Sequence, residues 1–175
     1  AHLACNIAKE LGVLEEKIMG LHMASVVHDI GKIYIPAEIL TKPGKLSNVE
    51  YDIIKTHVQV SYDILKTIEF PWPIADIVYQ HHERENSTGY PLGLSGDEIL
   101  PEAKILAVAD VVEAISSHRP YRSALGLDKA LEEIQEKRGS LYDADVVDAC
   151  ISLFKSKGFI LEANEHESGE VLPQY

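Results

Sequence analysis

Two short runs of the sequence combine side chains that bind divalent metals at neutral pH. The first is His28-Asp29 and the second is His81-His82. Imidazole nitrogens and carboxylate oxygens are common ligands of first-row divalent metals. The two runs lie far apart in the chain, so together they predict a metal site that is assembled only when the chain folds.

Three further residues have suitable types for the same site. Asp110 falls on the apolar stripe of a predicted helix, where a carboxylate is costly unless it is paired, neutralised or bound to a metal. A fold that gathers all the candidates would create one site with two nitrogens and two oxygens, and a second site of imidazoles. The first set is His2, His28, Asp29 and Asp110, and the second is His57, His81 and His82, with Asp29 shared as a bridge.

The single histidines have a simpler interpretation. A lone helical histidine is more often a structural or surface residue than a ligand, and we interpret His22, His118 and His166 in this way. Taken alone, His28-Asp29 could cap a helix and Asp110 could pair with a buried base. The complete ordered set of residues favours the metal site.

Helical periodicity accounts for the whole pattern of apolar residues and predicts an all-α protein. The expected helices span residues 3–11, 14–29, 47–66, 74–84, 101–117, 128–138 and 143–157. Ser47 and Glu50 form a capping box that opens the third of them. The first histidine–aspartate run lies at a helix end and the second histidine run lies in a last helical turn. A polar loop over 85–96 is long enough to suggest a functional role.

Composition restricts the classes of function. The chain has 175 residues, 46% of them hydrophobic, which suits one domain, expected over 1–163 with a polar tail over 164–175. The net charge of -12 argues against binding of polymeric nucleic acid or an anionic membrane, so an anionic substrate would need metal. Two distant cysteines favour a reducing cytoplasm. No apolar run reaches the roughly 20 residues of a membrane span.

The motifs resemble those of the HD-GYP domains, a branch of the HD-superfamily of metal-dependent phosphohydrolases. The resemblance covers nearly the whole chain, and its combination of motifs is highly specific. It rests on His28-Asp29-Ile30-Gly31-Lys32-Ile33, Ile35-Pro36, Lys42-Pro43-Gly44-Lys45-Leu46, His57, His81-His82-Glu83, Gly89-Tyr90-Pro91, Gly93-Leu94, Val108-Ala109-Asp110 and Arg119-Pro120-Tyr121-Arg122.

This resemblance implies a compact multi-helix bundle that holds two or three divalent metals, commonly iron or manganese. It also implies hydrolysis of the bacterial second messenger cyclic di-GMP to pGpG or GMP, with two cations that acidify a bridging water. The resemblance assigns both sets of metal ligands named above, with Asp29 and Lys32 as catalytic residues. It assigns Lys32, Tyr90, Arg119 and Arg122 to the substrate.

The resemblance further implies an upstream regulatory domain and a diguanylate cyclase-type partner at the Gly89-Tyr90-Pro91 loop. The loop departs from the family pattern, which usually has aspartate and glycine where this chain has Asn86 and Ser87. Glycine takes positive φ at little cost and serine does not, so this difference predicts an altered loop. Two alternatives stay open: a module that binds a cyclic dinucleotide or a partner without turnover, and a hydrolase of another phosphoester such as cyclic GMP-AMP.

Overall fold

The computed structural model describes residues 1–116 and 126–161, and within these ranges it contains helices and no strand. The prediction of an all-α protein is confirmed. The predicted tail, 164–175, lies outside the described residues. The helical segments are α1 (His2–Glu10), α2 (Glu15–Val27), the 3₁₀ helix η1 (Ile30–Tyr34), α3 (Ala37–Leu40), α4 (Asn48–Leu65), α5 (Ile74–Gln80), the 3₁₀ helix η2 (Gly96–Glu98), α6 (Pro101–Ser116), α7 (Leu127–Glu136) and α8 (Ala144–Ser156).

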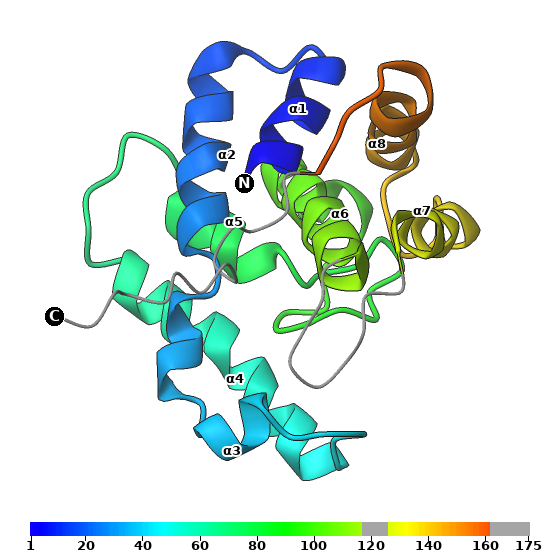
Figure 1. The fold of residues 1–175 in the computed structure, drawn as a ribbon. Coiled ribbons are helices and arrows are strands. Elements are labelled where there is room, and N and C mark those ends of the chain that lie inside the picture. The colour runs from blue at the N-terminus through cyan, green and yellow to red at the C-terminus, as the bar shows by residue number, and fades with distance from the viewer. Residues whose placement is uncertain (117–125, 162–175) are drawn as a thin grey trace, which may run out of the picture.

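Helix α6 forms the centre of the bundle. It contacts α1, α2, α5, α7 and α8, and in Figure 1 it lies between the α1–α2 pair and the α7–α8 pair. Its apolar residues fall on several faces, and most of them are fully buried, Ala103, Leu106, Val108 and Val112 among them. A helix that is apolar on most sides is stable only when it is enclosed. Asp110 is therefore carried on a central, enclosed helix.

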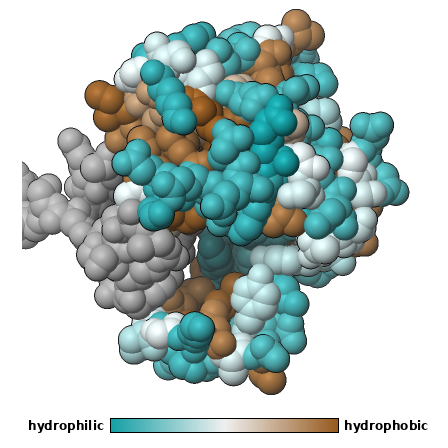
Figure 2. All heavy atoms as spheres, turned by 90° about the vertical axis from the view of Figure 1, so that its right-hand side faces the viewer, coloured by the Kyte–Doolittle hydropathy of each residue, from teal (hydrophilic) through white to brown (hydrophobic). Residues whose placement is uncertain are grey.

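Helices α3 and the first half of α4 form a lobe that projects from the rest of the bundle (Figure 1). The same lobe lies at the bottom of Figure 2, where a recess separates it from the larger body above. The capping box predicted at Ser47 opens α4: the Ser47 hydroxyl accepts a hydrogen bond from the Glu50 backbone N–H, and the Glu50 carboxylate accepts one from the Ser47 backbone N–H. The longest helix thus begins in the lobe and runs into the body.

Two helix boundaries differ from the predictions in ways that matter for the site. The helix expected over 14–29 ends at Val27, and a 3₁₀ helix follows it. The helix expected over 74–84 ends at Gln80, so the paired histidines lie just beyond it, with His81 as its C-cap residue. Periodicity did not show either early end, because neither run has a glycine or proline directly after the last helical residue.

Both cysteines, Cys5 and Cys150, are buried free thiols. Among the described helices, none combines the length and the apolar character that crossing a bilayer requires.

Candidate metal centre

The turn that carries His28 and Asp29 is held directly against the middle of α4. The Gly31 N–H donates to the Ser61 hydroxyl at 2.9 Å, and that hydroxyl donates to the carbonyl of His28 at 3.2 Å. Gly31 allows this approach, since a Cβ placed on it would lie 2.1 Å from the carbonyl oxygen of His57. The lack of a side chain at position 31 therefore brings Asp29 next to His57.

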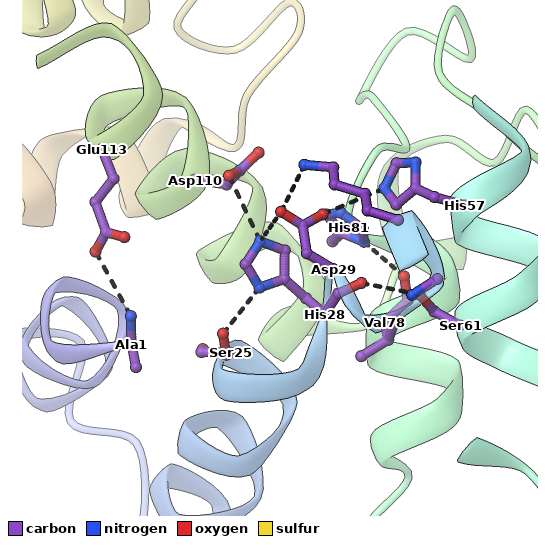
Figure 3. Close-up of polar contacts among 12 residues, drawn as sticks. Ala1, Ser25, His28, Asp29, His57, Ser61, Val78, His81, Asp110 and Glu113 are labelled. Carbon is purple, nitrogen blue, oxygen red and sulfur yellow. Dashed lines mark hydrogen bonds and ion pairs between the residues drawn. The ribbon is translucent and has the colours of Figure 1, made fainter. Parts of the chain in front are cut away.

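Four elements deliver the candidate ligands to one place (Figure 3). His28 caps the end of α2, with Asp29 directly after it, and His57 projects from the middle of α4. His81 and His82 follow α5, and Asp110 comes from α6. The abrupt end of α5 lets two consecutive residues face the same cluster, which an uninterrupted helix would point about 100° apart.

Three of the four histidines are oriented by the same backbone contact. The Nδ1 atoms of His28, His57 and His81 lie 2.6 to 2.8 Å from the carbonyl oxygens of Ser25, Ile54 and Val78. In each case the carbonyl belongs to the residue three positions earlier. A carbonyl only accepts hydrogen bonds, so Nδ1 carries the proton and Nε2 is left facing the cluster. This arrangement is typical of metal-binding histidines.

The Nε2 atoms of His28, His57 and His81 are all buried, and none has a hydrogen-bond partner. The Nε2 atoms of His28 and His57 lie 3.4 Å from the two different oxygens of the Asp29 carboxylate. His28 Nε2 also lies 3.6 Å from Asp110 Oδ1. Buried polar atoms normally have partners. Three such atoms pointing at shared carboxylates fit divalent cations.

Two overlapping groups have ligand atoms within 4.8 Å of one another. One is His57, His81 and His82, and the other is His28, Asp29 and His81. Asp29 lies between His28 and His57, which is the place that a bridging ligand would take. His82 completes the cluster, with its ring centroid 5.3 Å from that of His57.

Burial and charge separate the histidines into two kinds. Burial lowers the pKa of His81 to about 4 and also lowers the pKa values of His57 and His82, so these rings are neutral at pH 7. Burial would also lower the pKa of His28, but the close contact with the Asp110 carboxylate and the charge of Asp29 outweigh it and raise that pKa. The same contact lowers the pKa of Asp110 despite its burial. Neutral imidazoles and ionised carboxylates are the forms that bind metals.

Lys32 adds positive charge at the open side of the cluster. Its Nζ donates to Asp29 Oδ2 at 2.5 Å, across one turn of η1. Its side chain is 32% exposed, so the ammonium group reaches solvent as well as the carboxylate. A lysine in this position can contact an anionic substrate beside the metals.

The loop after the paired histidines is fastened to them by Glu83. The buried Glu83 carboxylate accepts hydrogen bonds from the backbone N–H groups of Leu92, Gly93 and Leu94, at 2.7, 3.2 and 3.0 Å. Gly89 packs so closely on this turn that a Cβ would lie 2.4 Å from the Cα of Glu83. The sequence pattern gave Glu83 no role, and its position directly after two candidate ligands was the only signal of one.

This fastening places Tyr90 against the cluster. The Tyr90 N–H donates to the carbonyl of His82 at 3.2 Å, and the Tyr90 ring stacks on the His82 ring with centroids 4.7 Å apart. The predicted substrate residue Tyr90 is thus packed on a candidate ligand.

Ser87 adopts a left-handed backbone conformation at the position where the family pattern has glycine. Its φ is 62°, and the neighbouring Asn86 side chain accepts hydrogen bonds from the N–H and the hydroxyl of Thr88. Small polar residues tolerate this region better than bulky ones, at some cost in energy. The serine thus adopts the positive φ that we expected it to avoid from the sequence, and an altered loop stays a prediction.

The structure does not gather every residue named from the sequence. His2 is exposed on α1, and its ring lies 5.2 Å from Phe159, on the side of the helix that faces the segment after α8. His2 stays a prediction as a ligand of the first set. Arg119 and Arg122 lie outside the described residues, as do His118 and His166. Ser61, which ties the turn to α4, had no recognisable signal in the sequence.

The sequence of this chain matches a known protein family. A family described as HD domain matches residues 1–146. The chain belongs to the HD domain family. The resemblance of this HD domain to the HD-GYP branch is confirmed by that match together with the relatives described next.

Two curated relatives show how close the similarity is. The "Cyclic di-GMP phosphodiesterase response regulator RpfG" of Xanthomonas campestris pv. campestris is 42% identical over 153 residues, 86% of the HD domain chain and 40% of that protein. The "3'3'-cGAMP-specific phosphodiesterase 3" of Vibrio cholerae is 36% identical over 139 residues, 79% of the chain and 30% of that protein. The chain thus spans less than half the length of these relatives.

A solved structure supports the fold. Bd1817, described as an HDG"Y"P protein from Bdellovibrio bacteriovorus, matches with a TM-score of 0.73 at 19% identity, over 87% of the HD domain chain and 49% of that chain. At this level of identity the likeness establishes the shared helical architecture.

Proposed function

We propose that this HD domain is a metal-dependent phosphodiesterase that hydrolyses a cyclic dinucleotide, with cyclic di-GMP as its substrate. One observation carries the proposal: the buried Nε2 atoms of His28, His57 and His81 lack hydrogen-bond partners and converge on the carboxylate of Asp29. Relatives named as cyclic di-GMP phosphodiesterases support the choice of substrate.

Two groups of side chains would hold two divalent ions. His28 and Asp110 would bind one, with His2 as a further predicted ligand. His57, His81 and His82 would bind the other, and Asp29 would contribute to both. When bound, such ions supply charge that neutralises a phosphodiester and lowers the pKa of a water molecule. We expect iron or manganese, as the resemblance to HD-GYP domains implies, and imidazole and carboxylate ligands are compatible with these ions.

The protein's own groups would orient the substrate and balance its charge. Lys32 would move from Asp29 to a non-bridging phosphate oxygen once cations neutralise that carboxylate. Arg119 and Arg122 stay predictions for further phosphate contacts, since a guanidinium forms two parallel hydrogen bonds with phosphate. Water would add to phosphorus and one P–O bond of the ring would break, giving linear pGpG. A second hydrolysis would give GMP.

A second candidate substrate follows from the relatives named as specific for 3'3'-cGAMP. That substrate has the same phosphodiester ring and differs in one base, so the same metal groups would act on it. The regulatory domain upstream and the diguanylate cyclase-type partner of the Gly89–Pro91 loop stay predictions, as does the cytoplasmic location.

The test is hydrolysis by protein of known metal content. The protein is stripped with a chelator, loaded anaerobically with iron(II) or manganese(II), and checked for metal by elemental analysis. Chromatography then follows pGpG and GMP. We expect turnover that His57→Ala reduces by at least a hundredfold, whereas His22→Ala, which alters an exposed histidine on α2, retains wild-type activity.

Absence of hydrolysis of every cyclic dinucleotide, by protein shown to hold two metals, would reject the proposal. Tight binding without turnover under the same conditions would instead select a binding module.

A further inference from the structure

Three residues of the projecting lobe, Tyr51, Asp52 and Lys55, lie near the loop that packs on the metal centre. None of them has a role in the function proposed so far. The Tyr90 ring stacks on His82, and Lys55 Nζ lies 5.9 Å from the Tyr90 ring centroid. The same Nζ lies 5.2 Å from the Tyr51 ring centroid. Both distances fall within the range of cation–π attraction. Lys55 therefore connects a ring on the lobe to a ring on the loop beside the cluster.

The side chains of these three residues are accessible. Tyr51 lies in the first turn of α4 and is 49% exposed. Lys55 donates to Asp52 at 2.6 Å, and the side chains of these two residues are 33% and 67% exposed. The lobe that carries them stands apart from the body across the recess visible in Figure 2. A flat molecule from solution can therefore reach an aromatic ring and both members of an ion pair on this lobe.

We propose that Tyr51, Asp52 and Lys55 form a guanine-binding subsite for one base of the dinucleotide whose phosphate the metal centre cleaves. The proposal rests on the function proposed above and extends it to the choice of base. In such a dinucleotide one ribose separates the base from the phosphate. A phosphate held at the cluster, past Tyr90, therefore places its base toward the lobe.

The chemistry of the three side chains matches guanine. An exposed tyrosine offers a stacking surface to any base. Lysine donates to the acceptors O6 and N7 of guanine, whereas adenine presents its amino group at the position of O6. A carboxylate accepts from the N1–H and the amino group of guanine, and adenine has an acceptor at N1. Lys55 therefore favours guanine at O6 and N7, and Asp52 favours it at N1–H and the amino group.

The chain contains a matched control on the same helix. The sequence Tyr62-Asp63-Ile64-Leu65-Lys66 repeats the pattern Tyr51-Asp52-Ile53-Ile54-Lys55 eleven residues later. It forms the same contacts, with Lys66 Nζ 5.3 Å from the Tyr62 ring and 2.5 Å from Asp63. Here, however, the ring packs on Tyr79, with centroids 4.5 Å apart. The second set thus has the same local chemistry, but its ring packs on Tyr79 and is less exposed than that of Tyr51.

The experiment compares the two sets in metal-loaded protein. We expect Tyr51→Ala to raise the KM for cyclic di-GMP about tenfold and to change kcat less than threefold, because stacking binds substrate and transition state alike. Tyr51→Phe, which retains the ring, should restore the KM to within twofold of wild type. Tyr62→Ala should not raise the KM. An equal effect of Tyr51→Ala and Tyr62→Ala on KM would overturn the subsite.

Base preference gives a second measurement. Asp52→Asn and Lys55→Met should each lower the ratio of kcat/KM for cyclic di-GMP over cyclic di-AMP about tenfold, whereas Asp63→Asn and Lys66→Met should leave it unchanged. An unchanged ratio in the first pair would refute the assignment of guanine.

Calorimetry with a slowly cleaved phosphorothioate analogue of cyclic di-GMP separates the subsite from the catalytic function. Binding that depends on Tyr51, in a protein without turnover, would support the subsite and reject the phosphodiesterase. Turnover that does not depend on Tyr51 would support the phosphodiesterase and reject the subsite. A protein that neither binds nor hydrolyses would reject both.

Discussion

The metal-free protein should lose stability as the pH falls from 7 to 4, and His81 should account for about 3 kcal/mol of that loss. His81 is fully buried and its pKa is lowered to about 4, from an ordinary value of 6.5. Each tenfold change in proton affinity is worth about 1.4 kcal/mol. Between pH 6.5 and pH 4 the unfolded chain binds a proton at this position and the folded protein does not, so acid favours unfolding.

The neighbouring histidines act in both directions and must be separated from His81. The lowered pKa values of His57 and His82 add to the loss of stability in acid. His28 has a raised pKa, so its contribution is present at low pH and disappears as the pH rises through that pKa. The difference between wild type and His81→Gln isolates the contribution of one ring.

The assay is urea unfolding in the presence of a chelator, followed by circular dichroism at a series of pH values. The free energy of unfolding of wild type should fall between pH 7 and pH 4 by about 3 kcal/mol more than that of His81→Gln. His22→Gln removes an exposed histidine and should follow wild type. Parallel pH profiles for wild type and His81→Gln would refute the claim that burial holds His81 in its neutral form.

Three substitutions test the backbone around the site. Gly31→Ala forces a Cβ against the His57 carbonyl, so it should lower the free energy of unfolding by about 3 kcal/mol and weaken Mn²⁺ binding. An unchanged affinity for Mn²⁺ in calorimetry would contradict this. Ser87→Gly should stabilise the protein by about 1 kcal/mol in urea unfolding, because glycine tolerates the φ of 62°, and any loss of stability would count against that reason. Glu83→Gln leaves one carbonyl oxygen for three N–H donors and should lower the free energy of unfolding by about 2 kcal/mol. Amide hydrogen exchange at Leu92 and Leu94 should accelerate, and unaltered protection of these amides would exclude the role of Glu83.

The sequence predicted the helices well because their apolar periods are regular, and it failed where a helix ends without an obvious stop. Gly31 marked the end of α2 only approximately, and nothing marked the end of α5 at Gln80. That second end decides whether His81 and His82 can share one cluster. Backbone geometry at a helix terminus depends on tertiary contacts, here the loop that folds back on the histidines, and a linear pattern does not contain those contacts.

In the candidate site, too, the sequence predicted the residue types but not the contacts that depend on the fold. The types and order of the residues were sufficient to propose two sets of ligands that share Asp29. The structure places His28 and His57 beside Asp29, and Asp110 next to His28. His2 was proposed from its residue type and from the family resemblance, and it stays a prediction, because a sequence pattern does not fix the direction of a single side chain. In the structure its ring lies against Phe159.

The contacts that orient three of the histidines have a consequence for how the site responds to mutation. The acceptors of their Nδ1 protons are the backbone carbonyls of Ser25, Ile54 and Val78. In many metal sites this supporting role belongs to a carboxylate side chain, which a single substitution can remove. Here the acceptor is a backbone carbonyl, which is present whichever residue occupies these three positions. The outer support of the histidines is therefore robust to point mutation, and the residues that supply it are free to vary as their own packing requires.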